Sequence, residues 1–170
     1  EKEQLNRYLL DIIEKQEARF DCMSNKTDVN IRLDDLINAV YQKTGKQVVV
    51  LIDEYDAPLL DVAHEKEKLD ELRNTMRNFY SPLKGNESML RFVFMTGITK
   101  FSQLSIFSEL NNITNISMDE PYAGICGITK EELLTQMSDD IDALAEHLEL
   151  SREETIQELK DHYDGYHFTW

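Results

Sequence analysis

The chain has 170 residues, of which 41% are hydrophobic and 30% charged, enough for a domain with its own core. Its formal net charge of −15 repels phosphate backbones and anionic surfaces, which argues against direct binding of nucleic acid or a membrane. No apolar run approaches the roughly 20 residues that cross a bilayer, and residues 1–20 are charged throughout, unlike a signal peptide. Cys22 and Cys126 match no disulfide framework, so we expect free thiols and a cytoplasmic location.

The first half of the chain alternates helical and strand patterns. Residues 2–20 repeat apolar side chains at helical spacing, which predicts an amphipathic helix. The same pattern returns after a polar stretch, and Gly45 marks the expected end of that second helix. The run VVVLI at residues 48–52 shows no polar alternation, which is typical of a parallel strand buried on both faces. A third helix is expected to end at Ser81-Pro82.

The second half continues the alternation. RFVFMTG, residues 91–97, predicts another buried strand, and residues 113–117 are a candidate third strand. Two S/T-x-x-E capping boxes predict helix starts near the C-terminus, at Thr129 with Glu132 and at Ser151 with Glu154. Strands separated by helices favour an α/β fold with parallel pairing.

Polar residues follow both predicted strands at the point where each ends. Asp53 and Glu54 follow the first strand, and Thr96 follows the second. Ligands of parallel α/β sheets gather at the carboxyl ends of the strands, so we expect these three side chains to lie together. Apolar residues followed by Asp-Glu also have the form of a Walker B motif, in which the Asp holds Mg²⁺ and the Glu orients or deprotonates water. The alternative is a solvated strand end or a helix-start signal.

Four segments in order resemble a known family. LIDEYDAPLL, FVFMTGITKFSQLSIFSELNNITNIS, YAGICGITKEEL and YDGYHF, within residues 48–168, are similar to the predicted AAA-ATPase-like family of bacterial proteins. That family is best known from gut Bacteroidetes and often carries a PD-(D/E)XK nuclease-like domain at its C-terminus. The resemblance implies a partial P-loop NTPase fold of the ASCE type, a three-layer parallel sheet with helices. Residues 1–128 would form the C-terminal part of this core, and residues 129–170 a helical lid-like subdomain.

The phosphate-binding pattern GxxxxGK[ST] is missing from the sequence. The sole Gly-Lys pair, Gly45-Lys46, is followed by Gln47, and Val40 stands where the first Gly should be. In the family this loop lies upstream, so the resemblance implies that the chain is a piece of a longer protein and lacks two central strands. We therefore expect ATP and Mg²⁺ to serve the full-length protein, and the isolated chain to be inactive. Apolar surface left by the missing strands is expected to drive self-association.

The resemblance assigns roles to individual residues. Asp53 would bind Mg²⁺, Glu54 would activate water and Thr96 would act as sensor 1, while Lys100 is a candidate phosphate contact or a surface lysine. Asp56 is expected to shape the turn by bonding backbone N–H groups.

Two alternatives belong to other functional classes. In the first, the fold is a nucleotide-sensing or protein-docking module without turnover, although such a module has no need of Glu54. In the second, Asp53, Glu54 and Asp56 are direct ligands of a metal-dependent hydrolase or nuclease, although the net charge of −15 offers no positive groove for a nucleic acid.

Overall fold

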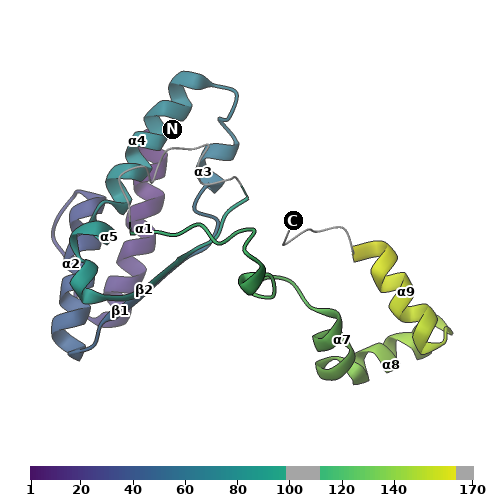
Figure 1. Cartoon of the computed structure of the whole chain (residues 1–170). Helices are drawn as coiled ribbons and strands as arrows, with labels where there is room; N and C mark the ends of the chain where they lie inside the picture. The colour runs from purple at the N-terminus through teal and green to yellow at the C-terminus, as the bar shows by residue number, and fades with distance from the viewer. Residues whose placement is uncertain (99–111, 164–170) are drawn as a thin grey trace. The chain divides into compact units, whose positions relative to one another are not determined.

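The chain divides into two compact units. The computed structural model describes residues 1–98 and 112–163, and its contacts separate Glu1–Thr114 from Asn115–Trp170. The first unit contains helices and a parallel sheet, and the second is helical (Figure 1). The division after residue 128, and the assignment of core and lid to the two parts, stay predictions.

Three long helices build most of the first unit, as their apolar spacing predicts. They are α1 (Lys2–Phe20), α2 (Val29–Thr44) and α4 (Lys66–Tyr80). Gly45 ends α2 with a left-handed φ of 64°, which confirms its expected capping role. Shorter elements complete the unit: α3 (Ala57–Leu60), α5 (Pro82–Gly85) and the 3₁₀ turn η1 (Glu87–Met89). Within the described ranges, no helix is long and apolar enough to cross a membrane.

Two strands pair in parallel, as predicted. β1 (Val48–Ile52) lies beside β2 (Leu90–Met95), with Ile52 opposite Met95. Val48, Val50 and Ile52 pack on the helical core. On the opposite face, Val49 is 52% and Leu51 70% exposed. The expectation of burial on both faces is therefore wrong for the residues described, because the core covers a single face. A P-loop order of strands stays a prediction.

The expected third strand at residues 113–117 is also wrong. Residues 113–116 have no regular structure, and residue 117 lies in a turn. The side chain of Asn115 explains this result, because its Oδ1 accepts hydrogen bonds from the backbone N–H of Ser117 at 3.0 Å and from the Ser117 hydroxyl at 2.7 Å. Such an Asx turn competes with strand pairing for the backbone.

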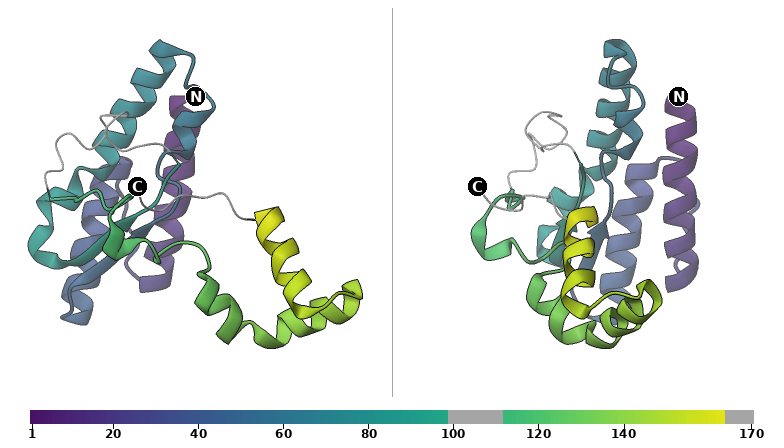
Figure 2. Two further views of the ribbon diagram at one scale, coloured as in Figure 1. Left: turned by 45° about the vertical axis from the view of Figure 1, so that its right-hand side comes forward. Right: turned by 90° about the vertical axis from the view of Figure 1, so that its right-hand side faces the viewer.

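The second unit is a chain of short helices, coloured green to yellow in Figure 2. They are η2 (Glu120–Tyr122), α7 (Lys130–Gln136), α8 (Ser138–Leu148) and α9 (Arg152–Tyr163). Both capping boxes are confirmed. In the first, Thr129 N–H donates to Glu132 Oε2 at 2.9 Å and Glu132 N–H donates to Thr129 Oγ1 at 3.2 Å. The hydrogen bonds from Thr129 hold the pKa of Glu132 below its usual value.

A buried ion pair joins α1 to α2. The guanidinium of Arg32 donates from Nε to Glu17 Oε1 at 3.0 Å and from Nη2 to Glu17 Oε2 at 2.5 Å. Glu17 is 0% and Arg32 5% exposed, so water screens this pair poorly. Arg32 also contacts the half-exposed Glu14 at 2.8 Å. These hydrogen bonds raise the pKa of Arg32, and the bidentate geometry fixes the orientation of the two helices.

We expect Glu17→Ala to lower the free energy of unfolding by about 3–5 kcal/mol, because it leaves the Arg32 charge buried without its main partner. Glu14→Ala, which removes the exposed partner of the same arginine, should cost less than about 1 kcal/mol. Urea unfolding followed by circular dichroism compares the two variants. Equal losses would contradict this account of the pair.

Candidate functional site

The loops that follow β1 and β2 are joined by backbone hydrogen bonds. Thr96 N–H donates to the carbonyl of Ile52, and Tyr55 N–H donates to the carbonyl of Thr96, both at 2.9 Å. These bonds continue the parallel pairing beyond the ends of the strands. The residues between Ile52 and Tyr55 are therefore held beside Thr96.

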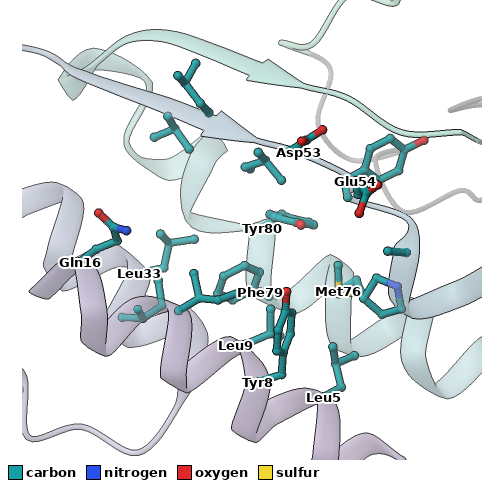
Figure 3. Close-up of a pocket in the computed structure, with 18 of the residues that line it drawn as sticks. Leu5, Tyr8, Leu9, Gln16, Leu33, Asp53, Glu54, Met76, Phe79 and Tyr80 are labelled. Atoms are coloured by element: carbon teal, nitrogen blue, oxygen red, sulfur yellow. The ribbon is translucent and has the colours of Figure 1, made fainter.

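Three predicted site residues meet at this edge of the sheet. The hydroxyl of Thr96 donates to the carboxylate of Asp53 and accepts the backbone N–H of Glu54 at 3.3 Å. Asp53 and Glu54 are exposed, and Figure 3 shows both at the end of β1. Lys100 lies outside the described residues. The structure thus brings the Thr96 hydroxyl together with the Asp53 carboxylate and the Glu54 backbone, while the chemical roles of these residues stay predictions.

Glu54 adopts an unusual backbone conformation. Its φ is 51°, in the left-handed region that side chains disfavour. Of the described residues, Asp21 and Glu149 are the other non-glycines with positive φ, and each caps the C-terminus of a helix, where this conformation is common. Glu54 instead follows a strand. Backbone strain of this kind concentrates at functional sites.

Asp56 and Gly97 lie where the two loops are in close contact. Asp56 is 0% exposed, and its Oδ1 accepts the N–H of Ile98 at 3.2 Å. This confirms that Asp56 bonds a backbone N–H, although the N–H comes from the other loop. A Cβ on Gly97 would lie 2.5 Å from the ring of Tyr55 and 2.6 Å from Asp56 Oδ1. The sequence analysis missed this role of Gly97, for which the Thr-Gly pair after a strand was the available signal.

The positions of Asp53, Glu54 and Asp56 limit how a metal ion could bind at this site. No group of three His, Cys, Asp or Glu side chains in the described part of the chain could hold a metal ion. Asp56 is buried and directed at the N–H of Ile98. This finding counts against the alternative in which Asp53, Glu54 and Asp56 are direct ligands. A single exposed carboxylate such as Asp53 suits an ion that keeps several of its waters, as Mg²⁺ does.

A cavity of about 1100 Å³ lies next to the site. Side chains of α1, α2 and α4 line it together with β1, and Asp53 and Glu54 stand at its end (Figure 3). Most of the lining is apolar, with Tyr80 among the residues on α4. Burial raises the pKa of the Tyr80 phenol, and the nearby negative charge of Asp56 raises it further, so this phenol stays protonated at neutral pH.

The fold and the site define an α/β protein with a polar cluster at the carboxyl ends of parallel strands. A family model described as "Predicted AAA-ATPase" matches residues 1–107. The chain belongs to this AAA-ATPase-like family. This match includes α1 and α2. Both helices lie before residue 48, where the sequence segments that resemble the family begin.

The chain is also similar to a longer curated protein over most of its own length. The chain is 35% identical over 138 residues to an "Uncharacterized protein in vnfD 5'region" of Azotobacter chroococcum mcd 1, an alignment that covers 81% of this chain and 25% of the relative. The chain thus spans about a quarter of the length of that relative. No solved structure matches the chain.

We expect Gly97→Ala to lower the free energy of unfolding by about 1–3 kcal/mol, since the new methyl group would overlap Tyr55 and Asp56. Gly85→Ala is the matched control, because a Cβ there meets nothing within 4 Å, and it should leave stability unchanged or raise it by up to about 1 kcal/mol. Thermal and urea unfolding measure both. A neutral Gly97→Ala would refute the close approach.

Glu54→Gly should raise the free energy of unfolding by about 0.5–1 kcal/mol, because glycine adopts the left-handed conformation without steric cost. Glu149→Gly is the matched control, because Glu149 at the C-cap of α8 has a φ of 56°. Its substitution should raise the free energy of unfolding for the same reason. Both are read from urea unfolding midpoints. A loss of stability in Glu54→Gly alone would show that the Glu54 side chain itself stabilises the fold.

Proposed function

We propose that this chain carries the Walker B and sensor part of a Mg²⁺-dependent ATPase. The observation that carries the proposal is the cluster of Asp53, Glu54 and Thr96, which two paired strand ends hold together through the Thr96 hydroxyl. Membership of the AAA-ATPase-like family supports it.

The cluster offers a separate task to each side chain. Asp53 would hold Mg²⁺ through its water shell, and the ion would neutralise charge on the phosphates of ATP. Glu54, which leaves the strand in a different backbone conformation, would orient or deprotonate the attacking water. Thr96 would fix the Asp53 carboxylate and report on the terminal phosphate. Lys100 would be a further phosphate contact.

The remaining parts of the nucleotide site would come from outside these 170 residues. The sequence has no GxxxxGK[ST] pattern, and that pattern supplies the backbone N–H groups and the lysine that bind phosphates. The curated relative is much longer than the chain, which leaves room for such a loop. We therefore propose that turnover belongs to the longer polypeptide. An attached nuclease-like domain stays a prediction.

We expect the longer natural polypeptide to hydrolyse ATP with Mg²⁺ and the 170-residue chain to show no turnover. In the longer protein, Glu54→Gln should lower kcat at least 100-fold while ATP binding persists, because the amide cannot accept a proton. Steady-state phosphate release gives kcat, and equilibrium titration with a fluorescent ATP analogue gives the affinity.

Glu67→Gln serves as the matched control, since Glu67 is an exposed carboxylate on α4 and its variant should keep full activity. Binding without turnover in the unmodified longer protein would favour the nucleotide-sensing alternative. Full activity of Glu54→Gln would exclude Glu54 as the catalytic base.

A further inference from the structure

The loop after β2 has little anchorage from its own side chains. Thr96 is half-buried and Gly97 is exposed, and Ile98 is 79% exposed. The loop after β1 differs, because Tyr55 and Asp56 are buried, at 5% and 0% exposed. The position of the exposed loop therefore depends mainly on hydrogen bonds to the buried one.

Backbone groups hold the exposed loop at Thr96, and a side chain holds it at Ile98. The N–H and C=O of Thr96 pair with the backbone of Ile52 and Tyr55, as described above. Two residues further on, the N–H of Ile98 donates to Asp56 Oδ1 at 3.2 Å. A carboxylate is a stronger hydrogen-bond acceptor than a neutral oxygen. Thr96 is thus fixed by strand pairing on one side and by Asp56 on the other.

Burial makes Asp56 a rigid anchor for this loop. Its backbone carbonyl accepts the N–H of Leu59 at 2.9 Å, and Leu59 is 1% exposed. Gly97 lets the loop approach the carboxylate, because a Cβ there would lie 2.6 Å from Asp56 Oδ1. A neutral side chain such as Asn could shape a turn without the free-energy cost of burying a carboxylate. A role limited to the turn therefore explains Asp56 poorly.

We propose that Asp56 is a positioning residue, which by holding the N–H of Ile98 sets the loop after β2 so that the Thr96 hydroxyl reaches Asp53. Asp56 acts through Thr96 and needs no contact with a substrate or a metal ion. The consequence for turnover rests on the proposed ATPase function, in which Thr96 fixes the Asp53 carboxylate. The position of the loop involves no nucleotide and is tested separately.

Substitutions at both ends of this hydrogen bond test the proposal. Ile98→Pro removes the N–H that Asp56 accepts and leaves the buried carboxylate in place. Ile98 is exposed and its φ is not positive, which is compatible with a proline. Ile98→Ala is the matched control, because it removes the same side chain and keeps the N–H. Asp56→Asn weakens the bond from the other end, since an amide oxygen is a neutral acceptor.

Hydrogen–deuterium exchange in the longer natural polypeptide, resolved to single residues, measures the loop without nucleotide. The amides of Tyr55 and Thr96 should exchange on the order of 10-fold faster in Ile98→Pro than in the unmodified protein. Asp56→Asn should give a smaller increase, and Ile98→Ala none. The amide of Ile37, a core residue of α2 that is 2% exposed, should stay unchanged, which separates release of the loop from general unfolding.

Steady-state ATP hydrolysis by the longer polypeptide measures the consequence for turnover. Ile98→Pro should raise the Mg²⁺ concentration that gives half-maximal rate by about 10- to 100-fold, the usual loss when a group that orients a metal ligand is displaced. Ile98→Ala should leave that concentration unchanged. In a Thr96→Val background, which has no hydroxyl to position, Ile98→Pro should have little further effect.

Two outcomes would overturn the proposal. Unchanged exchange of Tyr55 and Thr96 in Ile98→Pro would show that the loop does not depend on Asp56. Equal effects of Ile98→Pro on the Mg²⁺ requirement with and without the Thr96 hydroxyl would show a general structural role. If the unmodified longer protein has no turnover, the ATPase proposal fails by itself, and the exchange result alone decides the role of Asp56.

Discussion

The pairing of two backbone segments through Thr96 is the constraint on which the site depends. The N–H of Thr96 donates to the carbonyl of Ile52, and the carbonyl of Thr96 accepts the N–H of Tyr55, both at 2.9 Å. The loop between Ile52 and Tyr55 therefore has little conformational freedom. Side chains alternate between the faces of a strand, and a slip of one residue would carry Asp53 and Thr96 to opposite faces. The hydroxyl that reaches Asp53 is therefore a consequence of register as much as of residue type.

The same loops carry conformational costs that a purely structural connection would avoid. Glu54 adopts a left-handed backbone conformation, which glycine adopts without steric cost. Gly97, at which a side chain would fit badly, allows the second loop to approach closely. The strained conformation of Glu54 accompanies a backbone N–H that reaches the Thr96 hydroxyl. Natural proteins accept such local losses where activity needs them.

The sequence predicted the elements well where the signal was local. The unbroken run at residues 48–52 indicated a parallel strand, and the Thr129 and Ser151 boxes marked helix starts that the structure confirms. Interactions between distant residues could not be foreseen. The pairing of Arg32 with Glu17 and the contact of Gly97 with Tyr55 join separate segments.

Burial is the other property that local pattern left undetermined. Hydrophobicity in the strand at residues 48–52 indicates which side chains gain from being covered, but the pattern does not say what covers them. The core covers Val48, Val50 and Ile52 and leaves Val49 and Leu51 exposed. The position of the site residues was predicted correctly. The carboxyl ends of neighbouring parallel strands lie at the same edge of a sheet, and this geometry places Asp53 beside Thr96.

The link between Arg32 and Glu17 has a consequence for recognition. It fastens α1 to α2 inside the core, and a guanidinium keeps its charge throughout the pH range of folded proteins. The helix that forms one wall of the cavity is thus held in place before anything enters. A molecule that enters the cavity would meet a preorganised wall, so binding would lose little entropy in ordering this helix.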